Sequence, residues 1–323
     1  MRGQILKAAF LLVLAAPLAC LPQPYPNKPV RLVVPFPPGG GVDALGRIVG
    51  ERLSTFMGQP VIVDNRAGAG GIVGTEAAAK APADGYTLLV GSSGAMAVLP
   101  SLNPRLPYRP LEDFEPLTIG VLNSNILVVH PSLPVTSVGE LVALAKKQPG
   151  KLTFASGGIG TSLHLQGELF RMLAGVDIVH VPYKGTVPAL NDLMGGQTDM
   201  LFSDPSALGL VKSGKLRALA QTSPKRSPIM PELPTMAEGG VPGYNATAWY
   251  AFFAPAGTPQ SVLARLTAEL VRALDTPEVK SRLAAAGMSP SPSTAQELAT
   301  LMREDIQRWA DVVKATGVKL EQQ

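Results

Sequence analysis

The chain has 323 residues, of which 46% are hydrophobic, 16% charged and 5% aromatic. This composition excludes a disordered or fibrous protein, and the length is enough for about two domains. The formal net charge is only +4, and no basic run is interleaved with aromatic residues. The sequence therefore lacks the electrostatic footprint of a nucleic-acid-binding protein.

The N-terminal segment is typical of a signal peptide. Arg2 and Lys7 precede or flank an apolar run over residues 8–16, which is too short to span a bilayer because spanning needs about 20 apolar residues. The sequence therefore predicts export to the periplasm. Cys20 is the only cysteine and lies where this segment should end, so no internal disulfide is expected. It is either a lipid anchor or removed by ordinary cleavage, and Pro17 favours cleavage because it fits the lipoprotein pattern poorly.

From Val30 onward, short β-branched runs alternate with amphipathic segments. Such alternation predicts βαβ units, in which mostly parallel sheets carry helices on both faces. The segment 221–245 is rich in Pro, Ser and Gly, and is predicted to be a surface linker. The predicted strands are 30–35, 60–64, 86–91, 126–130, 152–155, 178–181, 199–203, 216–220 and 249–254.

Glycine-rich loops recur where a predicted strand ends and a helix begins. In open α/β sheets, ligands lie beyond the carboxyl ends of strands, and helix N-termini offer N–H groups to anions. A single glycine is more often just a turn residue. Several such loops on one side of their sheets instead favour a cleft that donates backbone and hydroxyl hydrogen bonds to a carboxylate. The loops are 34–43, 65–71, 91–94, 155–162 and 183–186, together with Ser203 and Asp204.

Motifs of nucleotide binding and of common catalysis are absent. No GxxxxGK[ST] occurs, and a GxGxxG pattern fails because Val73 stands at the third glycine. The GxSxG motif of serine hydrolases is not matched either, because Ala95 stands where its last glycine should be. The histidines show no paired metal spacing, and His164 with Glu168 four residues later is a weak signal by itself. We therefore expect no cofactor, no metal and no catalysis.

Three side chains near these loops have two interpretations each, and a fourth has one. Asp43 either stabilises the start of a helix or contacts the ligand, and Asp204 either accepts from a ligand or caps the next helix. Lys184 either supplies a cation to an anionic ligand or is solvated surface. His164 is expected to donate a hydrogen bond near the cleft.

These loops carry a resemblance to a known family. The chain resembles the Bug, or TctC-like, family of extracytoplasmic solute receptors from about Tyr25 to near its C-terminus. The segments that match are YPNKPVRLVVPFPPGGGVD at 25–43, QPVIVDNRAGAGGIVGTEAAAKAPADGYTLLVG at 59–91, ASGGIGTSLHL at 155–165, HVPYKGTVPALNDLMGGQTDMLFSD at 180–204 and FFAPAGTP at 252–259.

The resemblance implies an α/β fold of the periplasmic-binding-protein type, a type II-like Venus flytrap with two lobes. Its parts would be a signal peptide (1–20), the first part of lobe 1 (21–124), lobe 2 (125–246) and the second part of lobe 1 (247–323). The ligand would be a small carboxylate held by main-chain groups, and the expected binding residues are Phe36, Pro38, Gly39, Gly40, Asp43, Ser92, Ser93, Ser156, Gly160, Thr161, His164, Lys184, Gly185 and Asp204.

The resemblance also implies partners and leaves alternatives. A monomer would deliver the carboxylate to a membrane permease or to a sensor-kinase ectodomain. Gly41 and Val42 stand where many members carry a hydroxyl residue, which puts a hydroxyl contact from that loop in doubt. One alternative is a secreted hydrolase or isomerase using a serine with His164 and Asp204. Another is the two-lobed ligand-binding domain of a transcription regulator, but the signal peptide argues against it.

Overall fold

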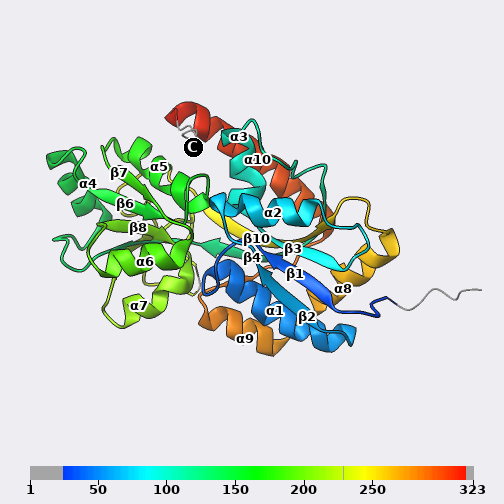
Figure 1. Cartoon of the computed structure of the whole chain (residues 1–323). Helices are drawn as coiled ribbons and strands as arrows, with labels where there is room; N and C mark the ends of the chain where they lie inside the picture. The colour runs from blue at the N-terminus through cyan, green and yellow to red at the C-terminus, as the bar shows by residue number, and fades with distance from the viewer. Residues whose placement is uncertain (1–24, 228, 318–323) are drawn as a thin grey trace, which may run out of the picture.

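A computed structural model describes residues 25–227 and 229–317 of the chain, so the predicted signal peptide and Cys20 lie outside the described residues. Within these residues the strands form two sheets that lie side by side (Figure 1). The first sheet has the order β11-β4-β10-β3-β1-β2. Its strands are β1 (Val30–Val34), β2 (Val61–Asn65), β3 (Thr87–Ser92), β4 (Phe114–Ser124), β10 (Thr247–Pro255) and β11 (Ser289–Pro290).

The second sheet has the order β7-β6-β8-β5-β9. Its strands are β5 (Ile126–Val129), β6 (Thr153–Ser156), β7 (Val179–Pro182), β8 (Met200–Ser203) and β9 (Arg217–Gln221). We call each sheet with the helices packed on it a lobe. The helices are α1 (Gly41–Met57), α2 (Ile72–Ala79), α3 (Leu99–Leu102), α4 (Val138–Lys147), α5 (Ser162–Ala174), α6 (Thr186–Met194), α7 (Leu208–Lys212), α8 (Gln260–Asp275), α9 (Pro277–Ala285) and α10 (Ala295–Thr316).

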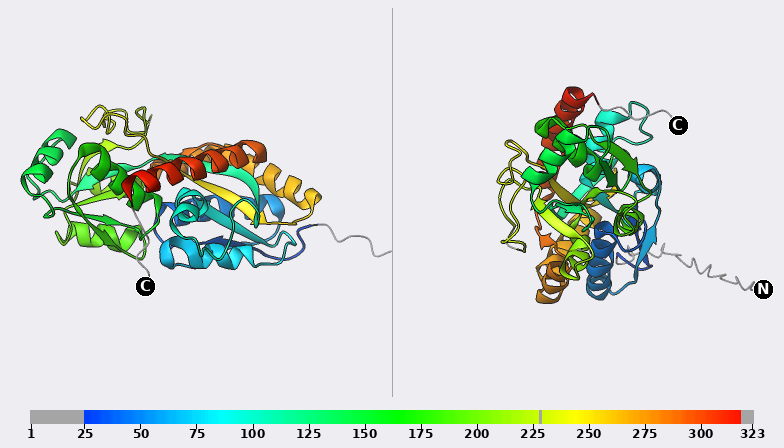
Figure 2. Two further views of the ribbon diagram at one scale, coloured as in Figure 1. Left: turned by 90° about the horizontal axis from the view of Figure 1, so that it is seen from above. Right: turned by 90° about the vertical axis from the view of Figure 1, so that its left-hand side faces the viewer.

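Helices cover both faces of each sheet, because the central strands are apolar on both sides. In β1, Leu32 and Val34 pack towards α1 and α8, whereas Val33 belongs to the core on the opposite face. The larger core runs through both lobes and includes the apolar face of α10. Helix α10 lies along the first lobe and reaches α5 of the second (Figure 2).

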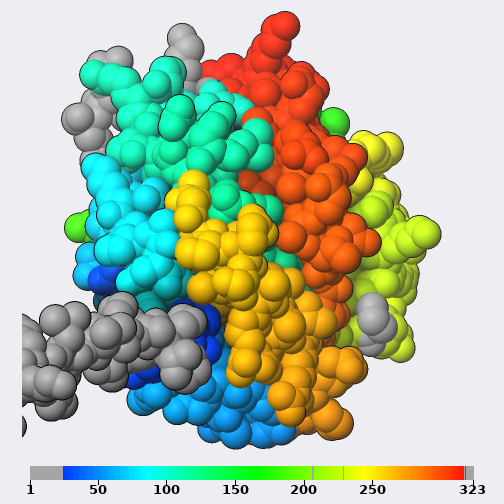
Figure 3. Space-filling view, turned by 90° about the vertical axis from the view of Figure 1, so that its right-hand side faces the viewer, coloured from blue at the N-terminus to red at the C-terminus, as the bar shows by residue number. Residues whose placement is uncertain are grey.

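The first lobe is assembled from both ends of the chain. Strand β10 returns from the second lobe and inserts antiparallel between β3 and β4. Figure 3, which looks at the first-lobe end of the molecule, shows N-terminal segments in blue and cyan beside C-terminal segments in orange and red. The described residues therefore have the predicted two-lobed α/β fold.

Two expectations about the sheets need correction. The sheets are mixed rather than mostly parallel, because β3, β4, β10 and β11 pair antiparallel with one another in the first sheet, and β5 pairs antiparallel with both neighbours in the second. Strand β4 was not predicted, since it contains Pro116 and Gly120, which are poor strand formers. Its register shifts against β10 at these places, as a β-bulge allows. The nine predicted strands all occur, within two residues at each end.

The segment between β9 and β10 is a structured part of the second lobe and not the surface linker that its composition predicts. Its side chains Met236, Val241 and Tyr244 are buried in the main core. Buried apolar side chains fix its path because they remove apolar surface from water.

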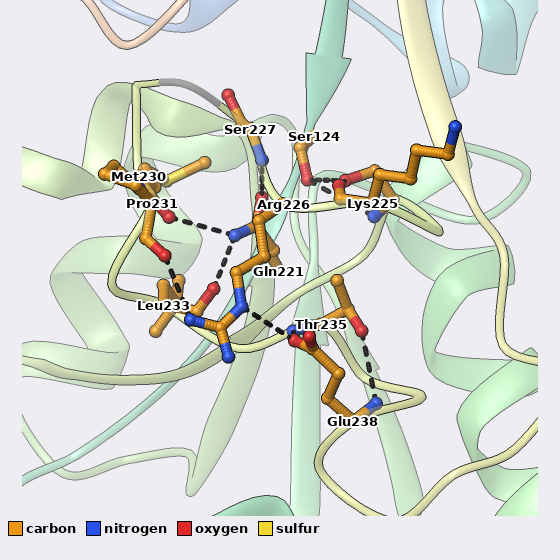
Figure 4. A network of polar contacts seen from close by, with 11 residues as sticks. Ser124, Gln221, Lys225, Arg226, Ser227, Met230, Pro231, Leu233, Thr235 and Glu238 are labelled. Carbon is orange, nitrogen blue, oxygen red and sulfur yellow. Dashed lines mark hydrogen bonds and ion pairs between the residues drawn. The ribbon is translucent and has the colours of Figure 1, made fainter.

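This segment is also fixed by polar contacts near the place where the chain changes lobe (Figure 4). The buried Gln221 side chain bonds to main-chain groups of the segment, and Arg226 Nε donates to Glu238 Oε2 at 2.9 Å. The hydroxyls of Ser124, at the end of β4, and Ser223 lie 2.7 Å apart. The β4–β5 connection and the β9–β10 connection, which both link the two lobes, are thus in contact with each other.

Candidate functional site

Three helix N-termini meet at one cavity between the lobes: α1 from the first lobe, and α5 and α6 from the second. Gly40 precedes α1 and Gly185 precedes α6, and glycine has no side chain with which to cap a helix. The cavity, together with the open space at its mouth, has a volume of about 490 Å³. It is lined by Phe36, Pro37, Gly40, Gly41, Val42, Ser92, Gly157, Thr161, Ser162, Leu163, Thr186, Val187, Asp204 and Tyr250.

Asp204 is the one charged residue that lines this cavity among the described residues. It is 2% exposed, and its Oδ2 accepts from Gly41 N of the other lobe at 3.4 Å. A Cβ atom at Gly41 would stand 3.1 Å from both Asp204 Cγ and Tyr250 Cε2. Only glycine therefore lets the start of α1 come this close to the second lobe.

The lobes also touch at the side of the cavity. A Cβ atom at Gly94 would stand only 2.8 Å from Ser162 N, at the start of α5. Gly94 opens the π-helical turn Gly94–Val98 that follows β3. The first lobe therefore contacts the second where the α5 N-terminus begins, and the cavity lies enclosed between them.

On the first-lobe side, Asp43 supports the cavity wall from within its own lobe. Its Oδ2 accepts from Gly39 N and from Arg47 Nε, each at 2.9 Å, and its Oδ1 accepts from Asn65 Nδ2 at 2.8 Å. Burial by itself would raise the pKa of this carboxyl, but the hydrogen bonds from Arg47, Gly39 and Asn65 outweigh it and hold the pKa below its ordinary value. Asp43 therefore fixes the loop before α1 as an ionised carboxylate.

On the second-lobe side, the loop 156–161 is held by its own hydroxyl groups. Ser156 Oγ and Thr161 Oγ1 both donate to Gly158 O, at 3.2 and 2.8 Å. Thr161 Oγ1 also accepts from His164 N, which caps α5. Of these two hydroxyl residues, Thr161 lines the cavity and Ser156 is fully buried behind it.

Two histidines stack behind this loop. The rings of His164 and His180 are 4.0 Å apart, and Phe154 lies against His180 at 4.7 Å. His164 Nδ1 accepts from Gly160 N at 3.2 Å, and His180 Nε2 lies 2.7 Å from Ser156 Oγ. Burial lowers the pKa of His164 to about 3, helped by His180 and Arg171, and burial lowers that of His180 to about 4. Both imidazoles are therefore neutral at physiological pH.

The contacts of these histidines bear on the catalytic and metal alternatives. His164 Nε2 is 3.8 Å from Glu168 Oε1, and Glu168 is already paired with Arg171 at 2.8 Å. Among the described residues, no three His, Cys, Asp or Glu side chains gather as metal ligands. A Ser156–His180 contact exists, but the hydroxyl is buried and donates to Gly158 O. It does not present a nucleophile to the cavity.

A second, wider chamber adjoins the first across Phe36, Pro37 and Gly157, which line both. Together with the open space at its mouth it has a volume of about 1020 Å³, and the NRAGAGG loop contributes residues 68–71 to its wall. Lys184 is exposed there and is the one charged residue in this lining among the described residues. The chamber is open to solvent and has a positive charge at its edge.

The predicted binding residues fall into three groups. Phe36, Gly40, Ser92, Thr161 and Asp204 line the first cavity, and Phe36 and Lys184 line the second chamber. The remaining predictions line neither: Pro38, Gly39, Asp43, Ser93, Ser156, Gly160, His164 and Gly185.

Sequence reasoning also missed several lining residues. Gly157, Ser162 and Thr186 lie in loops that the glycine pattern had marked, so a choice of whole loops would have included them. Tyr250 carried no signal, because it reaches the cavity only through the antiparallel pairing of β10 with β3. The fold and this cavity define the class of two-lobed solute-binding proteins, in which the ligand lies between the lobes.

Comparisons with known proteins place the chain within that class. The family model of the tripartite tricarboxylate transporter family receptor matches residues 45–318. Protein BugT of Bordetella pertussis is 42% identical over 310 residues, which cover 95% of this chain and 94% of BugT. The chain therefore belongs to the TctC, or Bug, family of solute receptors, and the resemblance seen in the sequence is confirmed.

Solved structures agree with this assignment. A structure described as a periplasmic transporter has a TM-score of 0.89 and 42% identity, covering 92% of this chain and all of that one. An R. palustris protein with adipate has a TM-score of 0.89 and 37% identity, covering 91% of this chain and 99% of its own. MatC of Rhodopseudomonas palustris, with bound malate, has a TM-score of 0.85 and 34% identity, covering 90% of this chain and all of its own. No helix of the described residues is long and apolar enough to cross a membrane.

Proposed function

We propose that this chain is a periplasmic solute-binding protein that captures a small carboxylate between its lobes, without chemical change, and delivers it to a permease or a sensor. The observation that carries the proposal is the convergence of the N-termini of α1, α5 and α6 on one enclosed cavity. Each helix start presents N–H groups and the positive end of a helix dipole, which favour an anion.

The cavity selects for charge and size in different ways. Its lining offers no lysine or arginine among the described residues, so the attraction for an anion comes from peptide N–H groups. The cavity is small and its walls come from both lobes, which suits a compact acid. Relatives that bind adipate and malate support the same class of ligand.

Closure of the lobes follows from the position of the donors. We propose that residues 21–124 and 247–323 move as one lobe and residues 125–246 as the other. Because α1 lies on one and α5 and α6 on the other, a ligand bound to all three stabilises the closed arrangement by its differential affinity. Asp43, Ser93, Ser156, Gly160 and His164 would support the walls.

The family gives the expected place and partners of the chain. The receptors of this family serve tripartite tricarboxylate transporters. We therefore propose delivery to a permease of that type, or to a sensor-kinase ectodomain, by a monomer exported through its signal peptide. Lipid attachment at Cys20 is the less favoured alternative to ordinary cleavage.

A ligand screen by thermal shift tests the proposal. Dicarboxylates, tricarboxylates, acidic amino acids and aromatic acids are added separately, and one class should raise the melting temperature by about 5 °C at a hundredfold excess over the Kd. If none of them shifts the melting temperature, the proposal is wrong. If a hit is turned over, the hydrolase or isomerase alternative replaces it.

The variant Gly41→Val tests the site itself. Its side chain would collide with Asp204 and Tyr250, so the lobes cannot close and the thermal shift should disappear. Gly209→Ala is the matched control, because a Cβ atom there meets nothing within 4 Å. An unchanged shift in Gly41→Val, with the folded state intact by circular dichroism, would place the ligand elsewhere.

A further inference from the structure

Beside the cavity, on the sheet face that carries two of its lining residues, lies a buried amide that the carboxylate site does not use. Tyr250 on β10 is paired with Ser92 on β3, and both line the cavity. Two residues earlier on β10, Ala248 is paired with Asn123 on β4. Directly opposed residues, and residues two apart on a strand, project from the same face of a sheet. Asn123 therefore shares the cavity face with Tyr250 and Ser92.

The Asn123 side chain is 1% exposed, and its amide makes no close hydrogen bond with the residues that the structure describes. It does interact with the hydroxyl of Tyr250, whose pKa it lowers. Burying an amide without partners is unfavourable, so native proteins rarely do so without a reason. An apolar residue of the same size would cost less at this position. One hydroxyl cannot satisfy both N–H donors and the oxygen of an amide. We therefore take the remaining hydrogen-bonding capacity of Asn123 as evidence for a polar partner that comes from outside the chain.

Two neighbours give this part of the cavity a defined chemistry. Burial raises the pKa of Tyr250 well above its ordinary value, and the charge of Asp204 raises it further, against a smaller opposing effect of Asn123. Tyr250 thus remains a neutral hydroxyl. Asp204 and Tyr250 flank Gly41, each 3.1 Å from the position of a Cβ atom there. The cavity wall therefore presents a hydroxyl and a carboxylate beside the first residue of α1, and the amide of Asn123 interacts with that hydroxyl.

We propose that Asn123, Tyr250 and Asp204 form a subsite for a hydrogen-bond donor on the ligand, an ammonium or hydroxyl group next to the carboxylate that the helix N-termini hold. The ligand class would then be amino- or hydroxy-substituted carboxylic acids. This inference rests on the proposed function and narrows it.

The charge of Asp204 explains why a donor is required. A plain hydrocarbon acid would place methylene groups against the buried carboxylate of Asp204, which attracts a hydrogen-bond donor far more than a hydrocarbon. A second ligand carboxylate at this position would be repelled by a like charge. An ammonium or hydroxyl donates to Asp204, and a hydroxyl also accepts from Asn123 Nδ2. Sites built around such polar groups discriminate strongly against ligands that lack the matching group.

Matched acids that differ by one donor test the proposal. The Kd is measured by isothermal titration calorimetry for succinate, malate and aspartate, for glutarate, 2-hydroxyglutarate and glutamate, and for benzoate and salicylate. In at least one set, the acid that carries the donor should bind about tenfold or more tightly than its parent.

Variants then assign the preference to the subsite. Asp204→Asn should remove most of the advantage of the amino acid over its parent, since the ion pair is lost. Asn123→Leu should reduce the preference for the donor-carrying acid about tenfold, while circular dichroism of the ligand-free protein stays unchanged. A purely structural asparagine would instead leave the preference intact.

Thr198→Val is the matched control. Thr198 is also buried, at 3% exposure, and its hydroxyl lacks a partner among the described residues, but it precedes β8 whereas Asp204 follows that strand. It should not change the ratio of Kd values. If parent and substituted acids bind equally well, the subsite is wrong and the carboxylate site stands. If no acid of any set binds, both the subsite and the proposed function are wrong.

Discussion

The two walls of the cavity hold their helix N-termini with different chemistry. On the first-lobe side, an ionised carboxylate, Asp43, collects hydrogen bonds from Gly39 N, Arg47 and Asn65. On the second-lobe side, neutral groups hold the loop before α5. His164, whose ring stacks on that of His180, accepts a hydrogen bond from Gly160 N.

The difference shows that a loop of peptide donors can be fixed either by charge or by buried neutral rings. The charged wall stays intact as long as Asp43 is ionised. The neutral wall stays intact as long as His164 and His180 are unprotonated. The two walls should therefore respond differently to acid, although both face the same ligand.

Acid should weaken the second wall first, and this is the largest effect we expect. The pKa values of His164 and His180 are lowered from 6.5 to about 3 and about 4. Between pH 6.5 and these values the unfolded chain binds protons that the folded chain does not, so the free energy of unfolding falls as pH falls. The slope should be about 1.4 kcal/mol per pH unit for each histidine, measured by urea denaturation at several pH values.

The variant His180→Gln isolates this contribution. Whatever its stability at pH 7, its slope between pH 6.5 and 4 should be shallower than that of the wild type, because one titrating group is gone. As the pH falls through 3.8, the ordinary pKa of the unfolded Asp43 carboxyl, that carboxyl binds a proton that the folded one does not, so both proteins should lose further stability. An identical slope above pH 4 in both proteins would contradict the neutral-wall interpretation.

Replacing Asp43 should weaken the first wall, with a smaller loss in the free energy of unfolding than acid causes through the two histidines. In Asp43→Asn the new NH2 group would face donors from Gly39, Arg47 or Asn65, so at least one hydrogen bond is lost inside a buried site. The free energy of unfolding should fall by about 2 kcal/mol, and ligand affinity should fall with it. Urea denaturation and calorimetry at pH 7 measure the two quantities.

Asp275→Asn is the control for the charge change alone. Asp275 pairs with Lys280 on the surface, and its side chain is 73% exposed, so the loss should stay below about 1 kcal/mol. Equal losses in the two variants would show that Asp43 is an ordinary surface charge and that the first wall does not depend on it.

The sequence predicted more of the fold than of the site. Apolar runs such as VRLVV in β1 are strong local signals, and the two-lobed arrangement followed from the family resemblance. Strand β4 was not predicted because Pro116 and Gly120 interrupt its run of strand-forming residues. Its place between β10 and β11 depends on contacts between residues far apart in the sequence. The antiparallel insertion of β10 between β3 and β4 also could not be predicted from local sequence patterns.

At the site, the sequence located the loops but not the side chains that face the ligand. Loop glycines are local features, so the pattern marked where the helix N-termini would meet. Whether Ser156 or Thr161 faces the cavity depends on hydrogen bonds inside the loop, and Ser156 turns inward to His180. Tyr250 and Asn123 come from strands that meet only in three dimensions.

The smallest expected effect concerns the cap of α5. Thr161→Val removes the hydroxyl that accepts from His164 N and donates to Gly158 O, and should lower the free energy of unfolding by about 1 kcal/mol. Thr276→Val is the matched control, since Thr276 caps α9 in the same way and does not line the cavity. It should cost a similar free energy. Only Thr161→Val should also weaken ligand binding, because only that cap orients N–H groups of the second wall. Equal affinities in the two variants would mean that the α5 N-terminus does not hold the ligand, leaving α1 and α6 as its donors.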